Sequence, residues 1–337
     1  MGRLRQLANP NALRLVLNRC LRPFDLSLYR SSWVDSLTSD RVVHTRVPLP
    51  EGAEQHLQAS NPRLMELRNR YRGHPAAAVS VWSDLRLEGE MELAYFRGDS
   101  QYLYQGRGTP EAAYALSADY VARYDALGLH KTLGEDGAFG ALTFLLDGRI
   151  VSRDLLDSTL EINALADWLG AERLAEARLL DVGAGYGRLA HRLCTWSSDA
   201  EVVAVDAVPV STFLCDYYLH YRGCSRARVA ALDEAEPLLA AGGFDIAVNV
   251  HSFAEAPRAS VTWWLEAIAA ADVPRLLIVH GDEHLFALES DLSRSDYGDV
   301  LERLGYRRVD LRPKYAHSDT VQRLGVFPAW YHFFERA

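Results

Sequence analysis

The chain has 337 residues, of which 49% are hydrophobic and 24% are charged, and its formal net charge is −9. This length leaves room for two domains, and the composition is that of an ordinary globular enzyme. The acidic balance argues against a general nucleic-acid-binding surface. An uncharged substrate, or one that is steered by a local group of opposite charge, fits the chain better.

Neither the cysteines nor the hydropathy pattern is typical of an extracellular or membrane protein. The cysteines, Cys20, Cys194, Cys215 and Cys224, form no CxxC pair and no zinc-like spacing, so we expect reduced thiols. No apolar run is long enough to cross a membrane. We therefore expect a cytoplasmic protein without membrane contact, and the sequence leaves the oligomeric state open, a homo-oligomer included.

Residues 1–150 have a mixed pattern, which we interpret as a mainly helical cap that determines substrate specificity. Amphipathic helices are expected near residues 12–20 and 112–127. Between them, residues 91–104 carry several aromatic side chains around a Gly98-Asp99 turn. This segment is typical of a hairpin or of a loop over a cleft, and the core of a small domain would give the same pattern.

Residues 151–337 carry an alternation of helices and strands. A helix is expected from Asp154 to a stop at Gly170. Strand candidates follow at residues 178–182, 201–205, 228–232, 244–250 and 275–279, with helical segments between them. Such alternation predicts a doubly wound, mostly parallel α/β sheet. Residues 306–311 and 326–334 then predict two strands joined by a loop, a connection that suits an antiparallel pair.

Three alternating glycines follow the first of these strands. The run Asp181-Val182-Gly183-Ala184-Gly185-Tyr186-Gly187-Arg188 passes from a strand into a helix. Glycines allow a ligand to approach the backbone, and the start of a helix offers free N–H groups. We expect an adenosine-containing ligand at this turn.

Acidic residues close the next two strands. Asp206 ends the second strand, where a carboxylate can accept hydrogen bonds from both ribose hydroxyls. Asp233 ends the third strand candidate, where it could face the adenine amino group. A solvated strand-end or helix-capping carboxylate is the alternative interpretation of each residue.

The spacing of the glycines distinguishes two classes of cofactor. A nicotinamide dinucleotide site requires Gly-x-Gly-x-x-Gly, and Arg188 stands at the third glycine position here. The observed Gly-x-Gly-x-Gly resembles the motif of S-adenosylmethionine-dependent methyltransferases, so S-adenosylmethionine is the expected cofactor. Asp181 is then expected to brace the turn near the amino-acid end of the cofactor, and Asn249 and Arg188 are counted with the binding residues.

Several blocks between residues 139 and 257 resemble one family, the bacterial sugar O-methyltransferases. These blocks are Phe139-Gly140, residues 154–162, residues 183–190, Val205-Asp206 with Tyr217-Tyr218-Leu219, and His251-Ser252-Phe253-Ala254-Glu255. The family favours Glu at 181, Gly at 184 and Asn at 251, where this chain has Asp, Ala and His. The resemblance implies a class I methyltransferase fold, with which the antiparallel pair at the carboxyl end agrees, and a carbohydrate as the small-molecule acceptor.

The fourth strand is followed by the first candidates for acid–base chemistry. Methyl transfer to a hydroxyl is an in-line displacement that must also remove one proton. We expect His251 to be the base and Glu255 to orient its ring. A histidine that merely covers the end of a strand is the alternative interpretation.

The fifth strand is followed by His280-Gly281-Asp282-Glu283-His284, a dense group of titratable residues. His280 and Asp282 are second-ranked candidates for catalysis, as an alternative base or as ligands to sugar hydroxyls. They could also hold Mg²⁺, which would make the acceptor hydroxyl more acidic. A solvated loop at the start of a helix would give the same pattern.

These patterns together predict O-methylation of a sugar hydroxyl, in a free sugar, a glycoside, an oligosaccharide or a nucleotide sugar. The alternatives within catalysis are methylation of a carbon, a nitrogen or a phenolic oxygen of a natural product, because one fold serves many acceptors. A non-catalytic protein that retains the fold is a further alternative, and a nicotinamide oxidoreductase is the least favoured one.

Overall fold

The structure is a computed structural model, which describes residues 47–77, 82, 92–98, 111–146 and 148–336, together with 17, 20 and 21. The helix expected over residues 12–20, apart from residues 17 and 20, and residues 91 and 99–104 of the aromatic segment lie outside the described residues. No helix in the described part of the chain combines the length and the apolar character that crossing a membrane requires.

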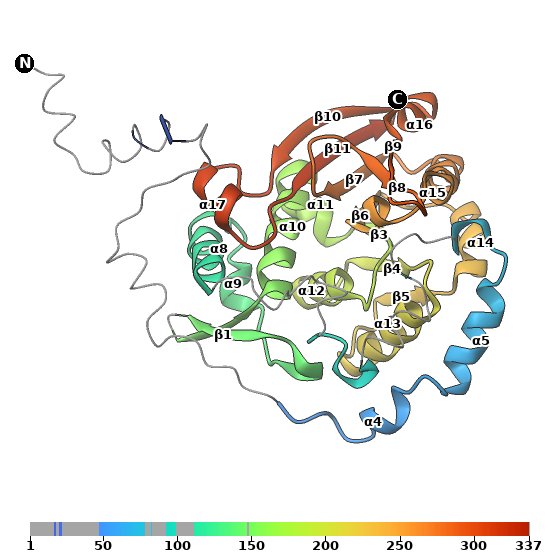
Figure 1. The fold of residues 1–337 in the computed structure, drawn as a ribbon, viewed down its shortest axis with the longest axis horizontal. Coiled ribbons are helices and arrows are strands. Elements are labelled where there is room, and N and C mark those ends of the chain that lie inside the picture. The colour runs from blue at the N-terminus through green and yellow to red at the C-terminus, as the bar shows by residue number, and fades with distance from the viewer. Residues whose placement is uncertain are drawn as a thin grey trace, which may run out of the picture.

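A seven-stranded sheet forms the centre of the molecule (Figure 1). Its strands are β3 (Arg178–Val182), β4 (Glu201–Val205), β5 (Ala227–Ala230), β6 (Ile246–Val250), β7 (Arg275–His280), β10 (Tyr306–Pro313) and β11 (Trp330–Arg336). Their order across the sheet is β10-β11-β7-β6-β3-β4-β5. The strands from β3 to β7 are parallel, and β11 is antiparallel to both of its neighbours. This confirms the expected doubly wound sheet with an antiparallel last strand, the arrangement of the class I methyltransferase fold.

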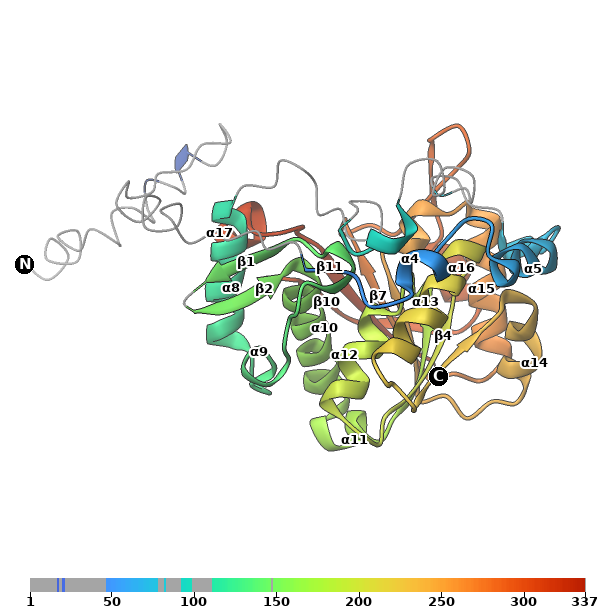
Figure 2. The same ribbon diagram turned by 90° about the horizontal axis from the view of Figure 1, so that it is seen from below.

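The parallel strands are apolar along their length because helices cover both faces of the sheet. In β6 and β7 every residue but one terminal residue is buried. The covering helices are α10 (Arg153–Leu169), α11 (Ala171–Ala175), α12 (Arg188–Trp196), α13 (Pro209–Tyr221), α14 (Ala235–Ala240), α15 (Arg258–Ala270) and α16 (Gly298–Arg303). Figure 2 shows α10 and α12 on one side of the sheet and α14 and α15 on the other.

Helix α10 begins and ends as the sequence predicts. The hydroxyl of Ser152 accepts a hydrogen bond from the N–H of Leu155, and Gly170 follows the last helical residue. Hydroxyl caps of this kind satisfy N–H groups that the helix itself leaves free. The first turn of α10 is thereby fixed beside the sheet.

Three local features differ from the sequence-based expectation. Strand β5 ends at Ala230 instead of residue 232, because Leu232–Glu234 form a 3-10 turn, η5. The segment between β10 and β11 contains a short helix, α17 (Asp319–Leu324), where a plain loop was expected. A small hairpin of β8 (Phe286–Leu288) and β9 (Arg294–Asp296) follows β7.

The amino-terminal part is mainly helical, as expected, and also contains one hairpin. Its elements are α4 (Ala53–His56), α5 (Pro62–Tyr71), η2 (Pro75–Ala77), η3 (Leu93–Tyr95), α8 (Glu111–Tyr124), α9 (Leu129–Thr132), η4 (Ala138–Gly140), β1 (Thr143–Leu146) and β2 (Arg149–Ser152). Helix α8 corresponds to the helix expected over residues 112–127. The antiparallel pair of β1 and β2 crosses the domain boundary that we placed after residue 150.

Helix α5 lies against α13 and η5 at the edge of the sheet domain (Figure 1). The hydroxyls of Tyr71 and Thr212 are 2.7 Å apart in a buried contact between the two helices. Leu64 and Leu67 of α5 belong to the same hydrophobic core as the strands of the central sheet. The amino-terminal elements thus extend the core of the sheet domain.

Candidate functional site

A cavity lies at the carboxyl ends of β3, β4 and β6, where the strand order reverses. Ligands of open α/β sheets bind at this position. One part of the lining is Asp181, Gly183, Ala184, Gly185, Tyr186, Arg188, Leu189, Asp206, Ala207, Val208 and Ser211. The other part is Ala76, Trp82, Arg153, Asp157, Val250, His251, Ser252, Phe253, Glu255, Ala256, Ser260, Trp264 and Phe327.

The turn requires glycine because its backbone has positive φ angles and because neighbouring side chains leave no room for a Cβ. Gly183 has φ 75°, and a Cβ there would lie 2.0 Å from the Ser252 hydroxyl oxygen. Gly187 has φ 85°, and a Cβ there would lie 2.8 Å from the sulfur of Cys215. Gly183 and Gly185 line the cavity, whereas Gly187 does not. Of the three glycines that we expected beside the ligand, Gly187 therefore serves the packing of the turn.

Asn249 supports this turn and does not line the cavity, contrary to its expected role in cofactor binding. Its buried amide nitrogen donates to the carbonyl of Val182 at 2.8 Å and to the Ser252 hydroxyl at 2.5 Å. Its amide oxygen accepts a hydrogen bond from the N–H of Phe253. The side chain therefore joins the ends of β3 and β6 and is fully used by the protein.

Two buried carboxylates lie at the turn. Asp206 accepts hydrogen bonds from the N–H of Gly185 at 2.9 Å and from the N–H of Val208 at 2.8 Å. Burial raises the pKa of Asp206 to about 6 and that of Asp181 to about 7. A ligand group that is cationic or donates hydrogen bonds would stabilise both carboxylates in their ionised form.

Asp233 is not part of the cavity, which corrects its expected position against the adenine. Because β5 ends early, Asp233 lies in η5 and faces α5. Arg70 donates to its two carboxylate oxygens at 2.9 and 2.7 Å. The ion pair attaches the amino-terminal part to the sheet domain.

Arg188 lines the cavity, but its charge is already neutralised. It forms a bidentate pair with Glu161 of α10, with distances of 2.7 and 2.9 Å. A third hydrogen bond reaches the Ser158 hydroxyl at 2.8 Å. Sequence reasoning did not assign Glu161 a role, although it falls in one of the blocks that resemble the sugar O-methyltransferases.

A polar cluster that sequence reasoning missed forms the wall on the side of α10. Arg153 donates from Nε to Asp157 at 3.0 Å, and its guanidinium carbon lies 4.2 Å from the centre of the Phe327 ring. Lys314 approaches the other oxygen of Asp157 at 2.5 Å. The spacing of Arg153 and Asp157, four residues apart on a helix, was the available signal for this pair.

His251 and Glu255 both line the cavity, as their positions after β6 led us to expect. His251 has φ 65°, and its ring packs edge-to-face on Phe327 with centroids 4.7 Å apart. Burial holds the pKa of His251 well below its usual value, so the ring is neutral.

Glu255 does not orient the His251 ring in the way that the sequence suggested. Its carboxylate accepts a hydrogen bond from the indole nitrogen of Trp82 at 2.5 Å. Burial raises the pKa of Glu255 to about 7. The two side chains thus share a cavity without a hydrogen bond between them in the described part of the chain.

His280 and Asp282 are not brought to the cavity. His280 is fully buried, accepts the N–H of Asp282 at Nδ1, and lies 3.2 Å from the carbonyl oxygen of Phe286 at Nε2. The Asp282 carboxylate accepts the N–H of His284 and so closes a local turn. These contacts give both residues a structural role in the loop after β7.

The described residues contain no group of three or more His, Cys, Asp or Glu side chains that could hold a metal ion. The Mg²⁺ site that the sequence left open beside His280 therefore has no ligand set in this part of the chain.

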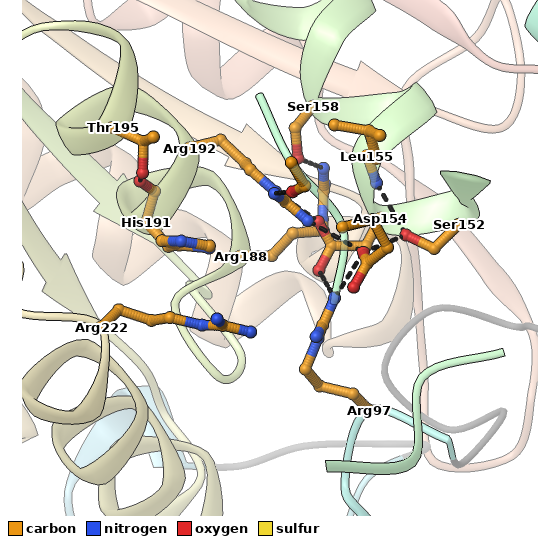
Figure 3. A network of polar contacts seen from close by, with 12 residues as sticks. Arg97, Ser152, Asp154, Leu155, Ser158, Arg188, His191, Arg192, Thr195 and Arg222 are labelled. Carbon is orange, nitrogen blue, oxygen red and sulfur yellow. Dashed lines mark hydrogen bonds and ion pairs between the residues drawn. The ribbon is translucent and has the colours of Figure 1, made fainter. Parts of the chain in front are cut away.

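A buried ionic network lies behind the glycine turn (Figure 3). Asp154 of α10 accepts hydrogen bonds from Arg97 and Arg192, each at 2.9 Å, and from the hydroxyl of Tyr186 at 2.7 Å. Glu135 accepts hydrogen bonds from the same two arginines. The network joins Arg97, which follows η3, and Glu135, which precedes η4, to α10, α12 and the turn.

No model of a known protein family matches this chain, and no curated protein does. Solved structures with a similar fold include magnesium protoporphyrin IX methyltransferase from Synechocystis PCC 6803 with bound S-adenosylmethionine. It is 14% identical, the match covers 55% of this chain and 83% of that one, and the TM-score is 0.41.

Two further solved structures with a similar fold are O-methyltransferases. The mitomycin 7-O-methyltransferase MmcR is 18% identical over 55% of this chain and 56% of that one, with a TM-score of 0.39. The O-methyltransferase NcsB1 from neocarzinostatin biosynthesis, with S-adenosylmethionine and a naphthoic acid, is 16% identical over 54% and 57%, with a TM-score of 0.38. Since these TM-scores are low, the assignment of the fold rests on the strand order.

Proposed function

We propose that this chain is an S-adenosylmethionine-dependent O-methyltransferase that acts on a hydroxyl of a sugar or sugar derivative. The observation that carries the proposal is the meeting of a glycine turn with two buried, unneutralised carboxylates, Asp181 and Asp206, at the switch point of the sheet. Such sites bind ligands in open α/β folds.

The hydrogen bonds of the turn favour this cofactor over a nicotinamide dinucleotide. A pyrophosphate needs free N–H groups and positive surroundings. The N–H of Gly185 is instead bonded to the Asp206 carboxylate, and Asp181 adds a second acidic group. S-adenosylmethionine has no phosphate, and its ribose hydroxyls and cationic groups suit carboxylates.

The residues of the chain would bind the cofactor and manage one proton. When bound, S-adenosylmethionine supplies a methyl group on a positively charged sulfur. Asp206 would accept hydrogen bonds from the ribose hydroxyls, and Asp181 would lie near the amino-acid part. His251, neutral and held by Phe327, would take the proton of the acceptor hydroxyl as its oxygen takes the methyl group.

The assignment of a sugar rests on the resemblance of α10, the turn and the segment after β6 to the sugar O-methyltransferases. The second part of the cavity lining supports it. Trp82 and Phe327 offer aromatic surfaces, and Asp157 and Glu255 offer hydrogen-bond acceptors. A few placed polar groups among aromatic side chains are typical of sites for small polar ligands.

Calorimetry with S-adenosylmethionine and, separately, with NAD tests the cofactor. We expect binding of the first and none of the second; the reverse result, or no binding of either, would overturn the proposal. Incubation with S-adenosylmethionine and a panel of sugars, glycosides and nucleotide sugars should then add the mass of one methyl group to an acceptor.

His251→Gln tests the role of the base, because glutamine keeps a polar group but cannot take the proton. A loss of turnover of about 10²-fold or more, without a loss of cofactor binding, is expected. Methylation of a phenol or an amine, with no sugar in the panel methylated, would contradict the sugar assignment.

A further inference from the structure

We propose that the acceptor carries an oxyanion, either a carboxylate or a phosphate, and that Arg153 binds this group in the cavity. This inference deepens the proposed function and rests on it. Its basis is a buried guanidinium in the cavity wall, one nitrogen of which has no hydrogen-bond partner among the described residues.

Arg153 is only 3% exposed and lines the cavity. Its Nε donates to Asp157, but its buried Nη1 nitrogen has no hydrogen-bond partner within the part of the chain that the structure describes. Buried charged donors are nearly always partnered, because an unpaired one loses its hydration without compensation. A carboxylate or phosphate oxygen of a molecule in the cavity can supply the missing acceptor. The cofactor carries one carboxylate itself, so the binding measurements keep S-adenosylhomocysteine bound and ask whether the acceptor's anion adds to it.

The charges around Arg153 do not balance. Asp157, its ion-pair partner, also receives Lys314 on its other carboxylate oxygen. The Lys314 ammonium donates to the carbonyls of Val326 and Phe327 as well, so all three of its protons have acceptors. Arg153 and Lys314 therefore share the single carboxylate of Asp157.

The other acidic residues of this wall do not supply the missing negative charge. Glu161 is taken by Arg188 in a bidentate pair. Glu255 makes no ion pair with Arg153 within the described chain and accepts the Trp82 indole instead. Burial raises the pKa of Glu255 to about 7 and outweighs the charge of Arg153, which lowers it, so near neutral pH this carboxyl does not fully offset the guanidinium.

Phe327 fixes the plane of the Arg153 guanidinium. The guanidinium carbon lies 4.2 Å from the ring centroid, which is a cation–π contact. A guanidinium stacked by its face presents its N–H groups at the edge, and this geometry suits the two oxygens of a carboxylate or phosphate. The net charge of −9 gives no general attraction for anions, so this local cation would select them.

Binding measurements on the full chain, with S-adenosylhomocysteine present so that no turnover occurs, test the proposal. The probes share one sugar ring: glucuronate carries a carboxylate, glucose 1-phosphate a phosphate, and methyl glucoside no charge. At least one anion should bind about tenfold tighter than methyl glucoside, as charge-assisted bidentate contacts allow. Glucuronate alone would identify a carboxylate, and glucose 1-phosphate alone a phosphate.

Arg153→Gln should bring the affinity for each anion down to that for methyl glucoside, measured as the ratio of the two affinities in the same variant. Arg258→Gln is the matched control, because Arg258 pairs with Asp299 on the surface and lies outside the cavity. Should Arg153→Gln fail to fold, Arg153→Lys keeps the charge but loses the bidentate fork, and a reduced preference in that variant supports the proposal.

Equal affinity of the wild type for the three probes, binding of none, or a preference that Arg153→Gln retains would overturn the inference. Cofactor binding separates this failure from failure of the proposed function. A chain that binds S-adenosylmethionine but does not prefer anions contradicts only the inference, whereas a chain that does not bind S-adenosylmethionine contradicts the proposed function.

Discussion

Asp206 combines a structural and a binding task in one carboxylate. It accepts two backbone hydrogen bonds, from Gly185 and Val208, and it faces the cavity. In Asp206→Asn one of those N–H groups would meet the NH₂ of the amide. We expect the affinity for S-adenosylmethionine to fall by about tenfold or more, or about 1.4 kcal/mol, as measured by calorimetry.

Asp233→Asn is the control for this substitution, because Asp233 pairs with Arg70 outside the cavity. The affinity of this variant should equal that of the wild type. A comparable loss in both variants would mean that the substitutions act through general destabilisation, and no loss in Asp206→Asn would contradict the assigned role.

Asp181 should make the stability of the chain depend on pH. Burial raises its pKa to about 7 in the folded state, against about 4 in the unfolded chain. Between these values the folded state binds the extra proton, so ionisation of Asp181 costs stability as the pH rises from about 4 to about 7.

Asp181→Asn cannot ionise and escapes this cost. The Tm of the variant minus that of the wild type, measured without cofactor, should therefore rise as the pH is raised from about 5 to about 7. Above about pH 7 the difference should level off, because Asp181 is then ionised in both the folded and the unfolded wild type. A difference that is flat or falls across the window would contradict the buried, unpaired state of Asp181.

At the scale of residues, the sequence predicted the positions of side chains that lie directly at the end of a strand. The turn, Asp181 and Asp206 are located by the ends of two strands, which local apolar runs reveal. Asp233 and Asn249 lie outside the cavity that the sequence placed them in, because their partners, Arg70 and the carbonyl of Val182, are set by tertiary packing. The Arg153 site was missed for the same reason.

Among the elements, α10 is the one that the rest of the site depends on. Its Asp154 neutralises Arg97, two residues after η3, and Arg192 of α12 (Figure 3). These two arginines hold the pKa of Asp154 far below its usual range despite its burial. Asp154→Ala would leave the two guanidiniums to share Glu135, with the half-exposed Asp136 3.7 Å from Arg97. We expect the substitution to lower the free energy of unfolding in urea by about 3–5 kcal/mol.

An exposed ion pair is the matched control for this substitution. Asp119 and Arg123 pair at 3.0 Å on the surface of α8, with side chains 52% and 67% exposed. Asp119→Ala should change the free energy of unfolding by no more than about 0.5 kcal/mol. Similar losses in the free energy of unfolding for the two substitutions would show that the buried network does not stabilise the fold.

Elements that the sequence missed are short or have weak patterns. The parallel strands are continuous apolar runs next to turns, and they were predicted within about two residues. The β1–β2 hairpin, η5 and α17 have only three to six residues each, too few for a periodic pattern to distinguish them from loops.

Across the whole molecule, the amino-terminal part acts as a wall of the site. Ala76 and Trp82 line the cavity beside residues of the sheet domain. Helix α5 packs on α13, and its buried leucines join the core of the sheet. The division into residues 1–150 and 151–337, with specificity in the first, stays a prediction, and the shared core argues that the two parts fold together.

Unfolding in urea tests this cooperativity. If the core is shared, tryptophan fluorescence and far-UV circular dichroism should follow one transition. Leu67→Ala opens a cavity in the buried face of α5, and it should cost about 2–5 kcal/mol and move both signals together. Met65→Ala, on the same helix but 46% exposed, should move neither by more than about 0.5 kcal/mol. An early fluorescence change in Leu67→Ala, with the circular dichroism of the sheet retained, would mean that the cap unfolds on its own.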